Sequence, residues 1–420
     1  MATNRWRGDA PAIAQVTTLT VGGLPSAGQV YGVTINGKTI SYTAGSSATN
    51  ASITTGLCAL LVLNTTPPEF QEAIWTNDGV SVITATAATT GVPFTLTASA
   101  TGAGTLTAAT TTPSVGPNHA DSPANWSLGT LPGTGDDVLI DGGADLLYGL
   151  GNLTASALDS FRVKASFVGA IGLPVRNTSG IGIGSSAGYV EYRPREYPIG
   201  SGVPVTIGEG PGAGPNLVNL ASAGTLALTV VTTGPAMRVS PVVNVSGCTD
   251  GALVATGGSI GLAADDDSLT GAIATMTISG TAAMTIGPSG SVTTISQDAG
   301  AIYSAGTAGG LTITGGAFTL TGTLDSVTAT PALSGQVEVL WRTGGTIGSA
   351  TFTGQGPGQS APILDCSVDP RAKTLTNSTF TGGAQLYDPN KTVTLTNPMS
   401  IDRASLAASD LGPVFTIQRT

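Results

Sequence analysis

The sequence predicts a mainly β protein in which a small α+β domain precedes a long parallel β-solenoid. Three observations predict this class. Of 420 residues, 60 are Gly and only 10% are charged, against about 7% Gly and about 25% charged residues in average proteins. Thr, Ser and Ala alternate with Val, Ile and Leu, as in strands joined by tight turns. Finally, only one segment has a persuasive helical pattern, whereas short strand patterns recur throughout the second half.

The composition also excludes several classes. An apolar content of 40% can bury a core, so disorder is not expected. The 25 acidic and 15 basic residues give a formal charge of −10, and no basic cluster follows Arg5 and Arg7, which argues against nucleic acid as a partner. No run approaches a membrane span, and residues 1–9 lack the apolar region of a secretory signal. The expectation is a protein that is made in a cytosol and either stays there or leaves by lysis or another route without a signal.

Residues 1–15 are expected to form an N-terminal arm and residues 16–111 a small α+β domain. The pair Asn36-Gly37 is a strong hairpin signal, and a helix is expected over 48–63 with Ser46 or Ser47 as N-cap. The strand patterns of this domain cover 16–21, 31–35, 39–43, 70–76, 80–85, 94–99 and 106–110.

The stretch VYGVTINGKTISYTA, then the helix, then GVSVITATAATTGVPFTLTAS resembles a small domain that recurs in phage virion proteins and flagellar-hook-associated proteins. The resemblance covers residues 16–111. It implies assembly on a surface and names no chemistry.

Residues 112–124 contain three prolines without apolar periodicity and are expected to be a linker. Three short motifs follow, namely Asn125-Trp126-Ser127, Leu131-Pro132-Gly133 and Asp136-Asp137-Val138-Leu139-Ile140. This arrangement resembles the entry into right-handed β-helices of bacterial surface and phage proteins. The resemblance implies that Trp126 caps the first coil and that the first strand follows the Pro-Gly turn.

The β-helix is expected over 125–400 and a C-terminal cap over 401–420, with a short helical stretch at 404–408. Strands begin about eight to ten residues apart, which predicts three strands in a coil of roughly 25 residues and about ten coils. The clearest strand patterns lie at 275–279, 283–286, 292–296, 311–314, 318–321 and 337–341. The alternative is a series of tandem β-sandwich domains, but no second linker breaks the pattern.

Residues that carry chemistry are scarce. The single histidine, His119, lies in the predicted linker, which argues against serine triads and histidine-ligated metals. Cys58, Cys248 and Cys366 lie far apart and are expected to be small buried side chains. No metal site, cofactor or catalytic residue is therefore predicted, and the chain is not expected to be an enzyme.

Two acidic features have competing interpretations. Asp265, Asp266 and Asp267 could offer oxygens to Ca²⁺, but a solvated turn between coils is favoured. In the strand at 337–341, alternation places Val337, Val339 and Trp341 inward.

The same alternation places Glu338 and Arg342 outward. They could form a glycan-binding face, but a plain surface ion pair is favoured.

The most distinctive segment contains the candidate binding residues Tyr189, Tyr192, Arg193, Arg195 and Tyr197. Tyr and Arg are enriched at interface hot spots, and nearby prolines indicate a stiff protruding loop. The segment is either a contact with a subunit or partner, or a structural insertion.

These observations and the resemblances together predict a structural component of a bacteriophage virion surface: a capsid decoration protein, head fibre or tail fibre that projects and attaches passively. The alternatives are a polysaccharide depolymerase of the tailspike kind and a bacterial surface adhesin. Expected partners are other virion proteins, a host-surface glycan and copies of the chain itself. Weakly polar outer faces favour a homo-oligomer, and the resemblance to phage fibres implies a trimer.

Overall fold

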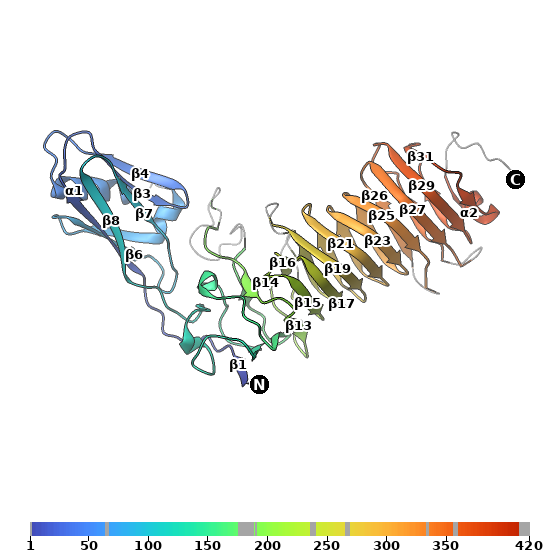
Figure 1. The fold of residues 1–420 in the computed structure, drawn as a ribbon, viewed down its shortest axis with the longest axis horizontal. Helices are drawn as coiled ribbons and strands as arrows, with labels where there is room; N and C mark the ends of the chain where they lie inside the picture. The colour runs from blue at the N-terminus through green and yellow to red at the C-terminus, as the bar shows by residue number, and fades with distance from the viewer. Residues whose placement is uncertain are drawn as a thin grey trace.

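The computed structural model describes residues 2–63, 67–174, 189, 191–235, 241–264, 269–332, 336–355 and 360–410. A small domain lies at one end of an elongated stack of strands, and the two parts meet at an angle (Figure 1). The described N-terminal residues lie near this meeting point, and the described C-terminal helix lies at the far end of the stack. The stack is the predicted solenoid.

The small domain contains two antiparallel sheets and one helix. The four-stranded sheet has the order β5-β6-β2-β8 and the three-stranded sheet the order β4-β3-β7. The helix α1 (Asn50–Leu61) packs against β2, β4, β5 and β6. The strands are β2 (Val16–Gly23), β3 (Val30–Ile35), β4 (Lys38–Thr43), β5 (Ala73–Asn77), β6 (Val82–Ala87), β7 (Thr97–Ala100) and β8 (Gly104–Thr112).

Local signals set three details of this domain. Asn36 and Gly37 have φ angles of 50° and 71° and connect β3 to β4, so the predicted hairpin is confirmed. The N-cap of α1 is Thr49 rather than Ser46 or Ser47, because the side chains and backbone amides of Thr49 and Ser52 form a reciprocal capping box. The strand predicted at 70–76 begins as a 3₁₀ helix, η1 (Pro68–Glu72), since prolines favour the first turn of a helix.

The solenoid contains two long parallel sheets. Within the described residues, the larger sheet contains fourteen strands and the smaller eleven. The larger consists of β1 (Ala2–Arg5), β9 (Asp136–Ile140), β10 (Ser160–Lys164), β13 (Pro204–Glu209), β15 (Thr225–Val230), β17 (Asp250–Ala255), β19 (Gly271–Ile278), β21 (Gly290–Gln297), β23 (Thr307–Ile313), β25 (Thr323–Ala329), β27 (Gly345–Thr353), β29 (Lys373–Thr381), β31 (Val393–Leu395) and β32 (Ser400–Ile401).

The smaller consists of β11 (Ala170–Ile171), β12 (Tyr197–Ile199), β14 (Leu217–Ser222), β16 (Val243–Ser246), β18 (Ser259–Leu262), β20 (Ala283–Ile286), β22 (Ala301–Ser304), β24 (Gly316–Leu320), β26 (Val337–Trp341), β28 (Ile363–Asp365) and β30 (Gln385–Tyr387). The strands pair in parallel from one coil to the next, as between β21 and β23 or between β22 and β24. Tandem sandwiches would need antiparallel pairs here, so that alternative is wrong for the described solenoid.

The coils are less uniform in length than the strand rhythm predicts. Ser291 pairs with Thr307, whereas Gly345 pairs with Lys373, so the first of these coils is much shorter than the second. From β13 to β30, each described coil has two strands rather than three, because the strand of the larger sheet bends within itself. In β21, the consecutive residues Thr293 and Thr294 both point outward, which breaks the alternation and turns a corner.

One continuous core runs through the coils, from Trp6 to Val393. Alternation along each strand supplies it, and the predicted inward residues Val337, Val339 and Trp341 are confirmed as buried. Side chains of the same kind stack on one another in neighbouring coils. For example, the rings of Phe352 and Phe380 are parallel and their centroids lie 5.0 Å apart. The three cysteines are buried and free, also as predicted.

The N-terminal segment predicted as an arm forms the outermost strand of the solenoid. β1 pairs in parallel with β9, so Ala2 aligns with Asp136. Trp6 and Trp126 lie edge to face over this first coil with ring centroids 5.0 Å apart, and both are 1% exposed. Their indole N–H groups donate to Ala144 O and Ala120 O. β1 is then the edge strand of the sheet, and Ser127 covers part of its open side by accepting a hydrogen bond from Arg5 N and donating one to Arg5 O.

The far end is covered by α2 (Arg403–Ala408), in the predicted short helical stretch. The carboxylate of Asp402 accepts hydrogen bonds from Gly382 N and Ser405 N, and the hydroxyl of Ser405 accepts one from Gly383 N. These contacts satisfy backbone groups beyond the last full coils. Residues 411–420, the rest of the predicted cap, lie outside the described residues.

In the described part of the chain, no helix has the length and apolar character that crossing a bilayer requires.

We predict that Trp126→Ala destabilises the first coils by about 3–5 kcal/mol, because the change empties a buried indole site. Hydrogen exchange at β1 and β9 should become faster, and guanidinium unfolding should begin at a lower concentration. Leu128→Ala is the matched control, since Leu128 is 47% exposed and should shift stability by less than about 0.5 kcal/mol. Unchanged exchange in the Trp126 variant would contradict the capping role.

Candidate functional site at the junction of the two parts

An enlarged coil connects the solenoid to the small domain. Phe161 of β10 pairs with Val205 of β13, whereas Pro204 of β13 pairs with Ala227 of β15, so the coil between β10 and β13 is nearly twice as long as the next one. The additional residues of this coil include Tyr189, Tyr192 and Arg193, whose side chains bond to the small domain. The candidate binding segment is therefore an insertion, and the described contacts of Tyr189, Tyr192 and Arg193 are made within the chain.

Glu72 of the small domain is the acceptor at the centre of this contact. It ends η1 and is 2% exposed. The phenol groups of Tyr189 and Tyr192 each donate a hydrogen bond of 2.6 Å to one of its carboxylate oxygens. The ring of Tyr192 also packs against the core of the small domain. The two tyrosines therefore tie the solenoid to the small domain through both polar and apolar contacts.

Arg193 is the cation that faces both carboxylates of this group. Its Nε and Nη2 donate to the two carboxylate oxygens of Glu191 at 2.7 and 2.8 Å, and Nη2 lies 3.5 Å from Glu72. Its Nη1 donates to the carbonyl of Pro93 in the small domain at 3.0 Å. The guanidinium also lies 5.5 Å from the ring centre of Tyr148, within cation–π range. We call Glu72, Tyr189, Glu191, Tyr192 and Arg193 the junction cluster.

Burial dominates the electrostatics of the cluster. Burial raises the pKa of Glu72 above 4.5, although the charge of Arg193 and the two phenol donors oppose the shift. Burial also raises the pKa of Tyr189 and of Tyr192. For Arg193, burial alone would lower the pKa, but hydrogen bonding to Glu191 and the charge of Glu72 raise it overall. Buried charges of this kind are tolerated only when paired and hydrogen-bonded, which all three ionic groups are.

The segment predicted as a linker forms a second connection. His119 is 4% exposed, and its Nε2 lies 3.0 Å from the carbonyl of Gly91 in the small domain. Its Nδ1 lies 3.3 Å from Asp121, whose other oxygen accepts a 2.6 Å hydrogen bond from Asn152. The His119 hydrogen bond is the main cause that lowers the pKa of Asp121. The single histidine thus makes structural contacts, which join this segment to Gly91 of the small domain and to Asp121.

Asn125 holds the same segment in place. Its side chain is fully buried in η2 (Pro123–Asn125) and accepts a hydrogen bond from Ala10 N. It donates to the carbonyls of Gly116 and His119. Residues 112–124 are therefore packed rather than free to swing, because their backbone groups are bonded on both sides.

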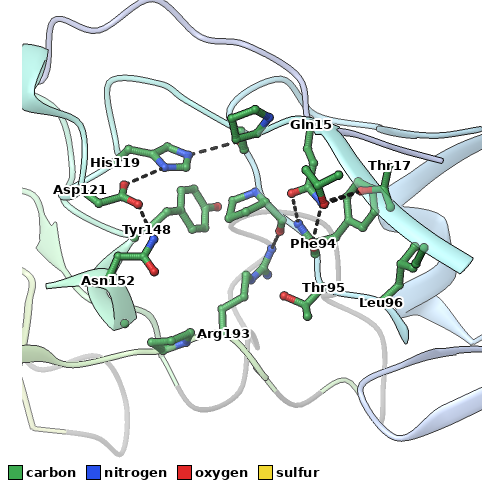
Figure 2. A pocket seen from close by; sticks show the side chains of 18 of the residues that line it. Gln15, Thr17, Phe94, Thr95, Leu96, His119, Asp121, Tyr148, Asn152 and Arg193 are labelled. Atoms are coloured by element: carbon green, nitrogen blue, oxygen red, sulfur yellow. Dashed lines mark hydrogen bonds and ion pairs between the residues drawn. The ribbon is translucent and has the colours of Figure 1, made fainter. Parts of the chain in front are cut away.

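A cavity of about 550 Å³ lies between the two connections (Figure 2). Gln15 and Phe94 line it from the small domain, and His119, Tyr148 and Asn152 line it from the solenoid side. Asp121 and Arg193 also line it, so charged, amide and hydroxyl groups lie beside aromatic rings. Such a lining can hold a small polar molecule, and cavities of this kind often lie between domains.

The remaining candidates of the predicted binding segment lie deeper in the solenoid. Tyr197 belongs to β12, is 3% exposed and packs on Phe161 with ring centroids 4.8 Å apart. Burial raises its pKa. Arg195 is half-buried, and its carbonyl accepts hydrogen bonds from Leu173 N and the Asn219 side chain. The junction cluster thus includes three of the five candidates, and Tyr197 is a core residue.

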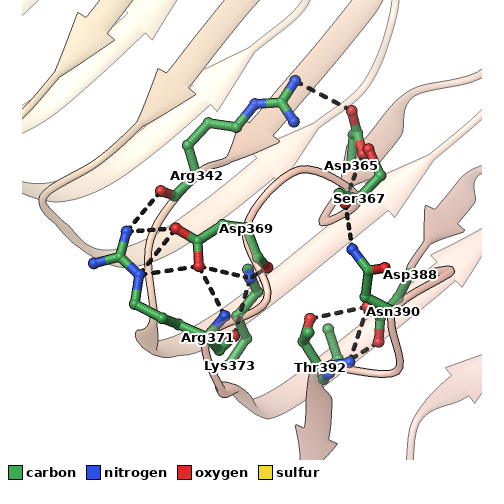
Figure 3. Close-up of polar contacts among 10 residues, drawn as sticks. Arg342, Asp365, Ser367, Asp369, Arg371, Lys373, Asp388, Asn390 and Thr392 are labelled. Atoms are coloured by element: carbon green, nitrogen blue, oxygen red, sulfur yellow. Dashed lines mark hydrogen bonds and ion pairs between the residues drawn. The ribbon is translucent and has the colours of Figure 1, made fainter.

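The predicted ion pair between Glu338 and Arg342 is wrong, because Arg342 has another partner. Arg342 pairs with Asp365 of the next coil, with Nη2 and Oδ2 3.4 Å apart (Figure 3). The register explains this choice, because Leu340 aligns with Asp365 across the sheet. Asp265, Asp266 and Asp267 lie outside the described residues.

A polar group near the end of the solenoid was not anticipated from the sequence (Figure 3). Lys373 is fully buried, and its ammonium donates to the carbonyls of Asp369 and Arg371. Hydrogen bonding to Arg371 lowers the pKa of Asp369 to about 2. Asp388, also fully buried, accepts hydrogen bonds from Thr392 N and Val393 N. These contacts hold the last turns in place.

Sequence reasoning missed Glu72, Tyr148, Asp121 and Asn152. Their partners lie elsewhere in the chain, so no local pattern reveals them. The scarcity of glutamate, with six in the whole sequence, was the only signal that could have directed attention to Glu72. Among the residues that the structure describes, no group of three His, Cys, Asp or Glu side chains is placed to hold a metal ion.

No family model, curated protein or solved structure matches this chain.

We predict that Arg193→Met separates the small domain from the solenoid, because two buried carboxylates would lose their cation. Breaking a buried ion pair costs about 3–5 kcal/mol. Small-angle scattering should show a larger radius of gyration, and hydrogen exchange at 72–77 should accelerate. Arg371→Met is the control, since Arg371 pairs with Asp369 at a side chain that is 63% exposed and should cost at most about 1 kcal/mol. Equal behaviour of both variants would contradict the assigned role.

A second prediction concerns pH. An acid whose folded-state pKa is raised binds more protons when folded, so its contribution to stability is present at low pH and is lost as pH rises. Relative to Glu72→Gln, the wild type should therefore lose unfolding free energy as pH rises from about 4.5 towards the folded-state pKa of Glu72.

Glu209→Gln supplies a control of opposite sign. Hydrogen bonding to Lys164 lowers the pKa of Glu209. Relative to this variant, the wild type should gain stability as pH rises towards 4.5. Denaturant titrations between pH 3 and 8 measure both differences, and a flat difference for Glu72 contradicts the prediction.

Proposed function

We propose that this chain is a passive structural protein that projects from a larger particle. The type that fits best is a surface component of a bacteriophage virion, which includes capsid decoration proteins, head fibres and tail fibres. Attachment to other virion proteins, and through them display towards a host-surface glycan, belong to the same proposal. The right-handed winding of the solenoid is part of the same proposal, since crossovers between parallel strands are almost always right-handed.

The observation that carries the proposal is the continuous stack of coils joined to the small domain through buried contacts. Thirteen strands follow one another along the larger sheet, which at about 4.8 Å per strand extends for roughly 60 Å. Each coil bonds only to its neighbours, so the stack is long in one direction and narrow in the others. Together with the junction cluster, this gives a stiff rod with a distinct domain at one end.

Two features support attachment through the small domain. The residues 16–111 resemble a domain of surface assemblies, and this domain lies at one end of the rod. The opposite end is covered by α2, whose contacts face the chain itself. The proposal therefore has the small domain dock and the far coils project.

The depolymerase and adhesin alternatives make different demands. A retaining or inverting glycosidase needs two carboxylates placed across a bound sugar, whereas Asp365, Asp369 and Asp388 are engaged in ion pairs and turns. An adhesin would need a surface that binds a host-cell partner. Neither alternative has a specific contact in its favour.

Gold labelling of particles can test the proposal. The native cysteines are buried, so a cysteine introduced at an exposed valine is labelled selectively. Val80→Cys marks the small domain and Val368→Cys the far coils, at side chains 64% and 66% exposed. On purified particles, gold at Val368→Cys should lie on the order of 50 Å farther out than gold at Val80→Cys.

Particles without label would contradict a virion role, and the reverse order of labels would contradict docking through the small domain. Release of reducing ends from bacterial polysaccharide by the purified protein would contradict a passive role.

A further inference from the structure

The cavity between the two connections combines polar groups with apolar surface. Asp121, Tyr148 and Asn152 lie together on one side of it, and Leu96 of the small domain lies on the other (Figure 2). The exposed ring of Pro194 adds further apolar surface. A ligand that fits this lining therefore needs both hydrogen-bonding groups and a hydrocarbon face.

The hydroxyl of Tyr148 is available to such a ligand. The ring contacts His119, with ring centroids 5.5 Å apart, and the guanidinium of Arg193, which lies 5.5 Å from the ring centre. Among the described residues, no group forms a hydrogen bond with the hydroxyl. Figure 2 shows it pointing away from His119 and Asp121, towards the small domain. A phenol hydroxyl both donates and accepts hydrogen bonds, so Tyr148 presents an unused donor and acceptor.

Asp121 reaches the cavity because residue 149 is a glycine. Gly149 has a φ angle of +74°, and a Cβ atom at this position would overlap the carboxylate of Asp121. One oxygen of that carboxylate faces His119 and the other accepts a hydrogen bond from Asn152. Each carboxylate oxygen can accept more than one hydrogen bond. Asp121 therefore keeps acceptor capacity for a ligand.

The charged groups of the lining already have partners of opposite charge, which selects against a charged ligand. Arg193 faces Glu72 and Glu191, so an anion would compete with two buried carboxylates. A cation attracted by Asp121 would meet the guanidinium of Arg193 in the same cavity, and like charges brought together are costly. A neutral molecule with several hydroxyl groups meets neither penalty.

We propose that this cavity binds a neutral sugar as a single pyranose ring. Its hydroxyl groups donate to Asp121 and to the amide oxygen of Asn152 and exchange a hydrogen bond with Tyr148, while its C–H face packs on Leu96 and Pro194. The volume of about 550 Å³ lies within the range of roughly 300–1,000 Å³ found for small-molecule sites. A ring of about twelve non-hydrogen atoms should bind with a Kd on the order of 1 mM.

A bound sugar would also hold the two parts of the chain together, because the cavity is lined from both. A ligand that binds only the intact junction stabilises it by mass action. Hydrogen exchange at residues 91–96 and 148–152 should therefore slow when sugar is added. This inference goes beyond the proposed function, which does not require the cavity.

Two substitutions with matched controls test the proposal. Tyr148→Phe removes only the free hydroxyl, and Tyr303→Phe removes a hydroxyl from a ring of the smaller sheet that is 45% exposed. Thr95→Trp fills the cavity from an exposed position in its lining, and Thr323→Trp adds the same side chain at an exposed position of the solenoid.

Ligand-observed NMR titrations measure the Kd of each variant. The neutral probes are glucose, galactose, mannose and N-acetylglucosamine, and the charged probes are glucuronate and glucosamine. At least one neutral sugar should bind the wild type and both controls with the same Kd. Tyr148→Phe should weaken that binding about 3- to 10-fold, as expected for one neutral hydrogen bond, and Thr95→Trp should abolish it.

Three results would overturn the proposal. They are the absence of saturable binding by every neutral sugar up to about 20 mM, tighter binding of a charged probe than of any neutral sugar, and wild-type binding by Thr95→Trp. Circular dichroism checks that the variants are folded. If Thr95→Trp does not fold, unchanged binding by Tyr148→Phe, whose hydroxyl has no described partner to lose, overturns the proposal instead. Gold labelling of particles reports separately on the proposed function, so either proposal can fail alone.

Discussion

Backbone pairing from coil to coil is the constraint on which the rest of this structure depends. Each strand of the two parallel sheets must find donors and acceptors on both sides, and the strands at the two ends have a neighbour on one side only. The chain meets this demand with its own termini. β1 is the last strand at one end, where Ser127 bonds the backbone N–H and carbonyl of Arg5 on the open side, and the turn before α2 bonds free amides at the other end. The long sequence separations in the fold follow from this need.

The same constraint explains why coil length can vary while the sheets stay in register. Residues that pair between strands are fixed by the inward columns of the core, since a slip of one residue would turn every apolar side chain outward. The turns between strands carry no such requirement. The short coil that joins β21 to β23 and the longer one that joins β27 to β29 therefore stack in one solenoid. For the same reason, the enlarged coil could grow outward while β10 and β13 stay paired from Phe161 with Val205 to Val163 with Ile207, although the register shifts at Lys164.

The enlarged coil fixes the small domain to the solenoid. Glu72 and Glu191 are buried together, which is costly without a cation. Arg193 lies within ion-pair distance of both carboxylates and also donates a hydrogen bond to the carbonyl of Pro93. An ion group of this kind sets orientation, because its hydrogen bonds form only when both parts are in place. The His119 connection on the far side of the cavity acts in the same sense.

The sequence by itself determined the features that depend on neighbours along the chain. The Asn36-Gly37 hairpin, the helix α1, the short strands and the inward alternation of Val337, Val339 and Trp341 all follow from local propensity and period. The solenoid class could also be predicted from the sequence, because its short strand patterns recur at close spacing. The length of each coil did not, because turns of different length preserve the same strand pattern.

Only the tertiary structure decided which distant residues meet. Tyr192 donates a hydrogen bond to Glu72, which lies 120 residues earlier in the chain. Arg342 pairs with Asp365 rather than with Glu338, which is closer in sequence, because the stacking of coils sets its neighbours. The alignment of Ser296, Thr312 and Thr328 on one face of the larger sheet is likewise not visible in the sequence. These residues share a face because the register of the strands aligns them, and that register is fixed by the packing of the core on the other side of the sheet.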